Sequence, residues 1–417
     1  MTTAIYWFRS DLRLIDCPAF RQACKDADFL LPIYIHQASL EKETAWGFLR
    51  MNEHRKAFLQ ESLDDLRMQL RDLGSDLFEM RGDPLEVFQD LRTQFDTNRI
   101  YCEQIEAPEE LDQIALLSKT GFELNSVWQS SMLDPQALPF KVEEMPDVFT
   151  QFRQQIEKHQ LRFADPVDAP SSIPPLPSNR EALCQGSSCD MLSRKKSFLG
   201  GESRALLHIE QYFDRRLPDT YKQTRNGLTG MDYSSKFSPW LALGCCSARS
   251  LAKKLTEYEL QYGANDGTYW LWFELLWRDY FRFLHFKYGN KLYRSRGLSA
   301  ESSNPFIETK FKQWASGHTG QSFIDAGMRE LHTTGYLSNR MRQIVASYWI
   351  YNMQGDWQAG AAWFESQLID YDVYSNQGNW LYIAGKGTDP RGGRPMNLFK
   401  QTQDHDPDGA YQKIWLR

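Results

Sequence analysis

Three segments in the second half of the chain combine residue types that could do chemistry. The first, residues 232–244 (DYSSKFSPWLALG), places three serine hydroxyls and the ammonium group of Lys236 directly ahead of a helical run. Hydroxyls, backbone N–H groups and a cation at the start of a helix suit the binding of a diphosphate. Taken alone, however, a serine-rich segment before a helix is more often only an N-cap, and the segment by itself favours that interpretation.

The second segment, residues 268–283 (TYWLWFELLWRDYFRF), carries one carboxylate among many aromatic residues. Helical spacing places four residues on one face: Glu274, Trp277, Arg278 and Phe281. A carboxylate inside such an aromatic wall needs a partner, which an active site would supply. A core helix with a Glu274–Arg278 surface pair explains the same pattern equally well.

The third segment, residues 368–397 (LIDYDVYSNQGNWLYIAGKGTDPRGGRPMN), is the hardest to explain by structure alone. It combines acids, glycines, asparagines and aromatic residues without regular periodicity. Because this pattern matches neither an amphipathic helix nor a strand, we expect a long loop that carries function.

Several common chemistries leave no signature in the sequence. The first strand is followed by Ser10-Asp11-Leu12, without a G-x-G-x-x-G or a G-x-x-x-x-G-K-[ST] motif. The motifs H-x-x-x-H and H-E-x-x-H are absent, and no Cys/His cluster occurs. We therefore expect neither of these phosphate loops and no metal site.

The elements that must position these segments differ between the two halves of the chain. In residues 1–163, the short apolar runs AIYWF, FLLPIYI, DLFEM, RIYCE and FELNSVW alternate with helical stretches such as residues 51–73. Asp83-Pro84 supplies an N-cap and a first-position proline for one of these helices. The alternation predicts a parallel α/β sheet for residues 1–163.

A proline-rich stretch separates this half from the next. Residues 164–179 contain five prolines, so we place an inter-domain linker at residues 164–198. From residue 199 to residue 417 strand-like runs disappear, and long amphipathic patterns at residues 269–288 and 335–353 predict helices. The expected fold is an α/β parallel-sheet N-terminal domain followed by an all-helical C-terminal domain.

Composition agrees with two domains and says little more about function. A chain of 417 residues, 41% of them hydrophobic, is long enough for two cores, and a net charge of −6 requires any basic surface to be local. Seven cysteines without a C-x-x-C pair favour the reducing cytoplasm as the location. The charged N-terminus and the lack of a run of about 18 apolar residues argue against a secretion signal or a membrane span.

Six motifs, which follow one another along the chain, resemble those of photolyases and cryptochromes, most of all cryptochrome DASH. They are YKQTRNG (221–227), YSSKFSPWLALG (233–244), FELLWRDYFRF (273–283), TGYLSNRMRQ (334–343), IDYDVYSNQGNW (369–380) and TDPRGGRPMN (388–397). The opening IYWFRSDLRL also matches the first strand of that family, so the resemblance covers nearly the whole chain. It implies a U-shaped FAD in the helical domain and an antenna chromophore associated with the α/β domain.

The resemblance also implies which residues contact the cofactor. The residues that match the FAD phosphate-binding segment and the helix beside it are Tyr221, Ser234, Ser235, Lys236, Phe237, Ser238 and Arg278. Those that match contacts to the isoalloxazine and ribose, including an Arg–Asp pair, are Arg342, Asp370, Asp372 and Asn376. Asn376 would face flavin N5, where a neutral amide tolerates a reduced anionic ring that a carboxylate would repel. Trp380, Trp357 and Trp314 match the tryptophan chain that passes electrons inward from the surface.

The implied substrate is a cyclobutane pyrimidine dimer in DNA, which excited reduced FAD would split by electron transfer. The matching pocket residues are Glu274, Trp277, Asn339, Gln343 and Tyr382, and the implied DNA contacts are Arg225, Arg340, Arg394 and Asn397. Glu274 and Asn339 would hydrogen-bond the pyrimidine carbonyl groups, while Trp277 and Tyr382 would stack on the extruded bases. Tyr382 offers less stacking area than a tryptophan, and Met396 stands where the family pattern has phenylalanine. We therefore expect a preference for single-stranded or distorted DNA.

Other interpretations stay open beside this one. A blue-light photoreceptor could bind FAD and nucleic acid without repair. Repair of (6-4) photoproducts is less favoured, because Asn339 and Gln343 stand where the resembling enzymes use two histidines. The expected antenna is 5,10-methenyltetrahydrofolate, with Glu103 or Glu106 as its carboxylate partner. We also expect a monomer and, since the chain ends shortly after Trp415, no C-terminal signalling tail.

Overall fold

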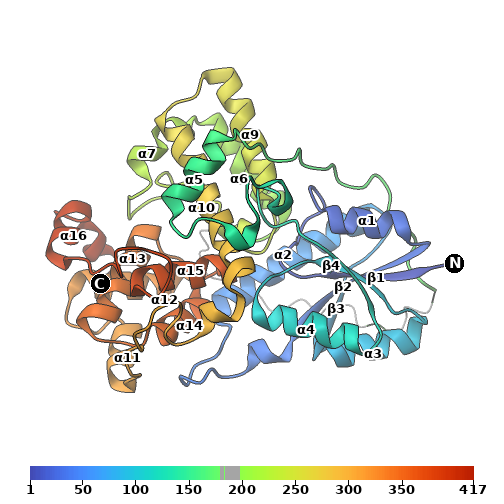
Figure 1. The fold of residues 1–417 in the computed structure, drawn as a ribbon, viewed down its shortest axis with the longest axis horizontal. Coiled ribbons are helices and arrows are strands. Elements are labelled where there is room, and N and C mark those ends of the chain that lie inside the picture. The colour runs from blue at the N-terminus through green and yellow to red at the C-terminus, as the bar shows by residue number, and fades with distance from the viewer. Residues whose placement is uncertain (179–182, 184–197) are drawn as a thin grey trace.

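The computed structural model describes residues 1–178, 183 and 198–417, which form an α/β half and a helical half packed together (Figure 1). The strands are β1 (Thr3–Phe8), β2 (Phe29–Gln37), β3 (Phe78–Gly82), β4 (Arg99–Glu103) and β5 (Glu123–Val127). All neighbouring strands are parallel, in the order β3-β2-β1-β4-β5, so the expected α/β sheet is confirmed. Within these residues, no helix has the length and apolar character needed to cross a membrane.

Helices bury both faces of this sheet. They are α1 (Pro18–Asp26), α2 (Glu53–Asp72), α3 (Pro84–Phe95) and α4 (Pro108–Lys119). Along β1, Ile5 and Trp7 join the core with α3 and α4, whereas Tyr6 and Phe8 join the core with α1, α2 and the helical half. Burial on both faces explains why β1 and most of β2 are continuous apolar runs in the sequence.

The strand order creates a crevice at one edge of the sheet. From β1 the chain first adds β2 and β3 on one side, and then crosses over to add β4 and β5 on the other. In such sheets, ligands bind outside the carboxyl ends of the two strands where the order reverses. Here those strands are β1, which is followed by Arg9, and β4, which ends at Glu103.

The helical half is confirmed as well. Its helices are α5 (Phe149–Lys158), α6 (Glu202–Asp214), α7 (Tyr221–Thr224), α8 (Ser238–Ala242), α9 (Ala248–Tyr262), α10 (Asp266–Tyr288), α11 (Glu308–Ala315), α12 (Ser322–Thr334), α13 (Asn339–Ser347), α14 (Trp357–Gln367), α15 (Val373–Ala384), α16 (Leu398–His405) and α17 (Ala410–Trp415). A π-helical turn, Tyr348–Asn352, continues α13. Residues 164–178 form no helix or strand, whereas residues 179–182 and 184–197 of the expected linker lie outside the described residues.

Helix α5 packs with the helical half, although it precedes residue 163 in the chain (Figure 1). Phe149 of α5 stacks on Trp277 of α10 with ring centroids 3.6 Å apart. The Asp279 carboxylate of α10 accepts hydrogen bonds from the backbone N–H groups of Met132 and Leu133, at 2.9 and 2.8 Å. Helix α5 therefore contacts the helical half, and the boundary at residue 163 stays a prediction.

The expectation of one long loop at residues 368–397 is wrong for its central part, which is helix α15. The Asp372 side chain caps this helix by accepting from Ser375 N, and Gly385 ends it with a left-handed φ of 66°. Helix α15 is buried on most sides, between α10, α13 and α14. It therefore lacks the polar face whose spacing would have revealed a helix in the sequence.

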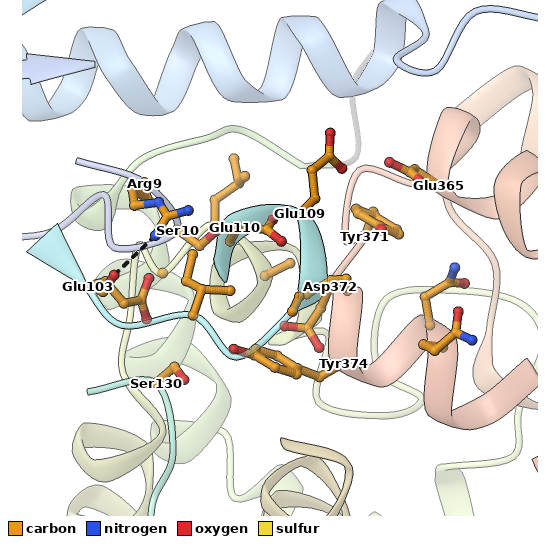
Figure 2. Close-up of a pocket in the computed structure, with 18 of the residues that line it drawn as sticks. Arg9, Ser10, Glu103, Glu109, Glu110, Ser130, Glu365, Tyr371, Asp372 and Tyr374 are labelled. Carbon is orange, nitrogen blue, oxygen red and sulfur yellow. Dashed lines mark hydrogen bonds between the residues drawn. The ribbon is translucent and has the colours of Figure 1, made fainter. Parts of the chain in front are cut away.

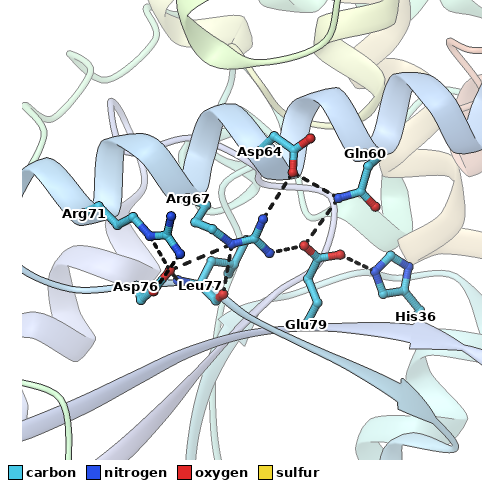
Figure 3. A network of polar contacts seen from close by, with 8 residues as sticks. All are labelled: His36, Gln60, Asp64, Arg67, Arg71, Asp76, Leu77 and Glu79. Carbon is cyan, nitrogen blue, oxygen red and sulfur yellow. Dashed lines mark hydrogen bonds and ion pairs between the residues drawn. The ribbon is translucent and has the colours of Figure 1, made fainter. Parts of the chain in front are cut away.

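A charged network ties α2 to the edge of the sheet (Figure 3). Arg67 of α2 forms an ion pair with Glu79 of β3, and His36 of β2 lies 2.6 Å from the other oxygen of Glu79. The side chains of Arg67 and Glu79 are 10% and 5% exposed. Burial opposes ionisation of Glu79, but the hydrogen bonds from His36 and Arg67 outweigh it and hold the pKa of Glu79 below its usual value.

We expect Arg67→Met to lower the free energy of unfolding by about 3 kcal/mol at pH 7, because it leaves a buried carboxylate without its cation. Since the pKa of Glu79 is depressed in the folded state, this stabilisation is present above the carboxyl's ordinary pKa of 4.5. It is lost as the pH falls through the depressed folded-state pKa. Urea unfolding at pH 7 and at lower pH measures both effects.

The matched control is Arg81→Met. Arg81 pairs with Glu41, and the two side chains are 70% and 56% exposed, so the expected loss is below about 1 kcal/mol. Equal losses in the two variants would show that burial of the Arg67 pair contributes nothing.

Candidate functional site

A cavity of about 410 Å³ lies where the carboxyl edge of the sheet meets the helical half (Figure 2). The sheet contributes Arg9 and Ser10 after β1 and Glu103 of β4, and the helical half contributes Tyr371 and Asp372 from the start of α15. This volume falls in the range of pockets that enclose small-molecule ligands. In the described part of the chain, no cluster of three histidine, cysteine, aspartate or glutamate side chains could hold a metal ion.

A second cavity, of about 70 Å³, lies within the helical half among α13, α14 and α15. Seven of the predicted site residues line it: Asn339, Arg342, Gln343, Asp370, Asp372, Asn376 and Trp380. Asp372 and Asn376 line both cavities, so the first turn of α15 forms a wall that they share. The tertiary structure thus brings together residues that the sequence assigned separately to cofactor and substrate.

Arg342 and Asp370 form a buried ion pair at the smaller cavity. Arg342 Nη2 lies 2.7 Å from Asp370 Oδ2, and the aspartate side chain is 1% exposed. The other oxygen, Oδ1, is buried and has no hydrogen-bond partner among the described residues. Because an unsatisfied buried acceptor is costly, this oxygen fits a ligand that brings an N–H or O–H donor.

Asp372 lies beside two guanidinium groups at the larger cavity. Its Oδ2 accepts a hydrogen bond from Arg282 Nη2 at 2.6 Å. Burial opposes ionisation, but Arg282 and then Arg278 outweigh it and lower the pKa of Asp372 to about 2. Arg278 was predicted as a cofactor residue, whereas Arg282 was missed. Arg282 could have been predicted from the sequence, because it lies one helical turn after Arg278 on the same helix, α10.

Asn376 is oriented by the protein. Its Nδ2 donates to the carbonyl oxygen of Ala361 at 3.0 Å. The amide therefore presents its own carbonyl oxygen as the end left for a ligand. A neutral amide at this wall is compatible with a ligand ring that changes its charge.

The segment predicted to bind the FAD phosphates precedes α8. Tyr221 and Phe237 are buried in the core, 6% and 3% exposed. Ser234 and Lys236 have φ angles of 59° and 60°, which few non-glycine residues adopt, so tertiary packing holds this turn in place. The hydroxyls of Ser234, Ser235 and Ser238 and the backbone N–H groups stay predicted phosphate contacts.

Lys236 is buried, and its contact with a diphosphate stays a prediction. Its side chain is 2% exposed, and Nζ lies 3.0 Å from the centre of the Tyr233 ring. Burial lowers the pKa of Lys236 to about 7, against the opposing effect of Glu330. Packing against Tyr233, which the local sequence does not reveal, directs the side chain into the protein interior.

The three predicted electron-transfer tryptophans do not form a series that ends at the surface. Trp380 lines the smaller cavity, and its ring centroid lies 6.3 Å from that of Trp314. Trp314 is 0% exposed, and its indole N–H donates to Val345 O at 3.1 Å, so it cannot be the surface end. Trp357 lines the larger cavity and donates to Ser295 O at 2.7 Å.

An aromatic corner forms at the predicted substrate pocket. Trp277 and Tyr382 meet edge to face, with ring centroids 5.7 Å apart. Phe149, which the sequence did not point to, stacks on Trp277. The Tyr382 hydroxyl accepts a hydrogen bond from Arg394, which Asp389 holds at 2.6 Å, so this predicted DNA contact lies beside the corner.

Glu274 is paired before any substrate is present. Its carboxylate forms an ion pair with Arg225, and their side chains are 29% and 22% exposed. Burial raises the pKa of Glu274, although Arg225 opposes the shift. Arg340 donates a hydrogen bond to Asn226 Oδ1 at 3.1 Å. Burial, and next the charge of Arg225, lower the pKa of Arg340. Asn397, in contrast, caps α16 by accepting from Lys400 N at 2.9 Å.

The structure separates the two predicted antenna carboxylates. Glu103 lines the larger cavity and is 1% exposed, and its Oε2 has no hydrogen-bond partner among the described residues (Figure 2). The Glu106 carboxylate instead accepts from Gln104 Nε2 at 2.6 Å. Burial, and next the charge of Asp11, raise the pKa of Glu103 to about 8. A raised pKa favours the neutral form of the carboxyl at the cavity.

We expect Glu103→Gln to be more stable than the wild type at pH 8, by on the order of 2 kcal/mol. In the unfolded chain this carboxyl ionises near its ordinary pKa of 4.5, whereas the folded protein keeps the proton to about pH 8. Wild-type stability should therefore fall as the pH rises between these values, and the glutamine variant should lack that slope. Thermal unfolding of pigment-free protein from pH 4 to pH 8 measures the difference, with the exposed Glu86→Gln as control. Parallel curves for wild type and Glu103→Gln would contradict a raised pKa.

Comparison with known proteins gives consistent matches along the chain. A family model described as DNA photolyase matches residues 4–174, and one described as FAD binding domain of DNA photolyase matches residues 270–417. Cryptochrome DASH of Gloeobacter violaceus is 42% identical, over 99% of this chain and 85% of that protein. A solved Synechocystis cryptochrome superposes with a TM-score of 0.93 at 40% identity, covering 99% of this chain and 88% of that one. For a class III photolyase from Agrobacterium tumefaciens, the TM-score is 0.83 at 25% identity, with coverages of 100% and 86%.

Proposed function

The chain belongs to the photolyase and cryptochrome family, with FAD as its cofactor, and on this premise we propose that it is a light-driven DNA repair enzyme. The proposed reaction splits cyclobutane pyrimidine dimers. One observation carries this proposal: the predicted substrate residues Asn339 and Gln343 line the same small cavity as the predicted cofactor residues Asp370 and Asn376. A dimer and a flavin bound by these residues would be neighbours, as short-range electron transfer requires.

Reduced FAD, when bound and excited by blue light, supplies the electron that opens the cyclobutane ring and accepts it back afterwards. The protein's own residues stabilise the negative charge on the dimer. Burial raises the pKa of Glu274, and its carboxyl can donate a hydrogen bond when it carries a proton. Together with the amide of Asn339, it would bind the pyrimidine carbonyl oxygens as charge develops on them.

We propose that the aromatic corner receives the dimer outside the DNA helix. Phe149 fixes Trp277 from one side and Arg394 fixes Tyr382 from the other, so both rings are positioned before binding. Removing a dimer from an intact duplex costs a few kcal/mol, and Tyr382 recovers less of it by stacking than a tryptophan would. We therefore propose that the protein favours single-stranded or distorted DNA.

Positive charge beside the corner supports binding of the phosphate backbone. Burial and then the charge of Arg225 lower the pKa of Arg340, whose Nε is buried without a partner among the described residues. An anion near these two guanidinium groups would relieve their repulsion. We propose Arg225, Arg340 and Arg394 as the phosphate contacts.

The larger cavity supports an antenna site. Glu103 offers a neutral carboxyl, which can both donate and accept a hydrogen bond, in the crevice between β1 and β4. We propose 5,10-methenyltetrahydrofolate as its ligand, with Glu103 rather than Glu106 as partner. Extraction of the purified protein's pigments, followed by mass spectrometry, would identify the molecule.

The decisive experiment is light-dependent repair by chemically reduced protein of one defined dimer, in single-stranded and double-stranded DNA at one stated salt concentration. We expect higher repair yield per absorbed photon on the single strand. Glu274→Gln should reduce the yield severalfold without loss of FAD. The exposed Glu308→Gln on α11 should not change it.

Two outcomes would support other functions. FAD-containing, reduced protein that repairs neither DNA form would favour the photoreceptor interpretation. Activity on (6-4) photoproducts in the same assay would contradict the assignment of Asn339 and Gln343, whose amides cannot act as general acids near pH 7.

A further inference from the structure

The interior behind Trp380 holds a stack of tryptophans that includes Trp349, which the sequence did not point to. Trp314 contacts Trp380 and stacks on Trp349, with ring centroids 5.2 Å apart and ring planes 27° from parallel. Trp349 and Trp314 are both 0% exposed. Beyond them, at the outer side of α14, lies the half-buried Trp363.

We propose that electrons reach Trp380 through this buried stack, from Trp363 by way of Trp349 and Trp314. The inference rests on the proposed function, because it describes how light would reduce the FAD. Each electron that Trp380 gives up is replaced from Trp314 and Trp349, and the one-electron vacancy ends on Trp363. A thiol or another one-electron reductant in the solvent then restores Trp363.

A glycine on α14 keeps the inner rings close. A Cβ atom at Gly360 would lie 2.3 Å from Trp380 Cη2 and 3.0 Å from Trp349 Cδ1. Unlike many glycines of this chain, Gly360 does not have a positive φ, so backbone conformation does not require a glycine there. The space that the missing side chain leaves is what lets Trp380 and Trp349 approach the same point.

Phe311 connects the stack to its outer end. Its ring centroid lies 6.1 Å from Trp314, 5.7 Å from Trp349 and 5.8 Å from Trp363. Phe48 stacks on Phe311 and also meets the Trp363 ring edge to face at 5.0 Å. Because tunnelling falls steeply with separation, a continuous series of ring contacts is the favourable path for an electron.

The surroundings of the indoles also direct the positive charge outward. The N–H groups of Trp314 and Trp349 donate to the backbone carbonyl groups of Val345 and Asp356, at 3.1 and 2.7 Å. An amide carbonyl is too weak a base to take the proton of an oxidised indole, so the charge stays free to move. A charge costs least where water reaches it, which among these tryptophans is Trp363.

Trp357 belongs to a different part of the molecule. Among the described residues, no ring contact joins it to Trp380, Trp314, Trp349 or Trp363. It faces the larger cavity instead. The buried stack and a route through Trp357 therefore make different predictions about which tryptophan is oxidised.

The test is to illuminate FAD-containing protein in air without thiol, and then to locate oxidised tryptophans by peptide mass spectrometry. We expect the oxidation to concentrate on Trp363 and to remain there in Trp357→Phe protein. Trp363→Phe should lose this mark and reduce its FAD more slowly in light. Trp415→Phe, which removes another half-buried tryptophan, should match the wild type in both measurements.

Oxidation concentrated on Trp357 instead, or photoreduction by Trp363→Phe at the wild-type rate, would overturn the inference. If Trp363→Phe does not fold, the distribution of oxidation in the wild-type protein decides by itself. Repair by chemically reduced wild-type protein does not use this route, so its failure would contradict the proposed function and leave the route to be judged by the oxidation pattern.

Discussion

We expect Trp380→Phe protein to bind FAD and to show no measurable reduction of that FAD by light. Trp380 is the tryptophan that lines the smaller cavity with Asp370 and Asn376, and it contacts Trp314 directly. On the proposed route, it is the last donor before the flavin. Phenylalanine keeps the ring packing but is far harder to oxidise than tryptophan, so the variant should separate electron supply from binding.

The variant needs three measurements. Absorbance gives the flavin content, illumination with a thiol gives the rate of photoreduction, and chemical reduction followed by a single-turnover assay gives repair. We expect repair to stay near the wild-type level, because chemically reduced FAD does not need the electron that Trp380 is proposed to supply. A stability loss of about 2 kcal/mol is typical of such a core substitution. If chemically reduced protein lost repair as fully as it lost photoreduction, Trp380 would act on the substrate as well.

The second large effect is expected from Asp370→Asn. The substitution leaves Arg342 beside the smaller cavity without its counter-charge, and breaking such a buried pair costs about 3–5 kcal/mol. It also replaces the carboxylate whose buried Oδ1 has no hydrogen-bond partner among the described residues and fits an N–H or O–H donor of a ligand. We therefore expect the purified variant to be colourless or nearly so, and to unfold at a lower denaturant concentration.

A control separates loss of stability from loss of the binding group. Asp266→Asn makes the same chemical change in a pair with Lys222 whose side chains are 74% and 43% exposed, and it should cost less than about 1 kcal/mol. Titration of folded Asp370→Asn protein with FAD at low temperature then reports binding alone. Wild-type affinity in that titration would show that Asp370 stabilises the fold without contacting the cofactor.

Local patterns were enough to predict the elements of the α/β half. The five apolar runs correspond to the five strands, and the most continuous of them belong to β1 and β2, which are buried on both faces. Asp83 caps α3 by accepting from Leu85 N, with Pro84 in the first turn, as the dipeptide predicted. These features depend on residues within a few positions of one another.

The same reasoning failed where the surroundings decide. Helix α15 was expected as a loop because it is buried on most sides and shows no amphipathic period. Lys236 was expected at a phosphate because lysine suits that role. Its side chain is buried against Tyr233, a contact that the local sequence does not reveal. Trp314 was expected to lead to the surface, yet it is 0% exposed and packs against Trp349 and Phe364.

The candidate site divides in the same way. Its residue types could be named from motifs, and Asn339, Arg342, Gln343, Asp370, Asn376 and Trp380 do meet at one cavity. Phe149 and Trp363 could not be singled out, because each is an ordinary residue in its own segment. Their importance comes from contacts with segments far away in the chain, such as Phe149 with Trp277.

The sequence by itself determined the order of the elements, the two-part architecture and the family, because hydrophobic periodicity, capping residues and long motifs are local properties. Only the tertiary structure decided which of two carboxylates, Glu103 or Glu106, faces a cavity and which tryptophans touch. Burial, pKa and ring contact depend on neighbours that the folded chain brings from elsewhere. The residue type determines which chemistry a side chain can do, whereas the surroundings in the folded protein determine which role it has.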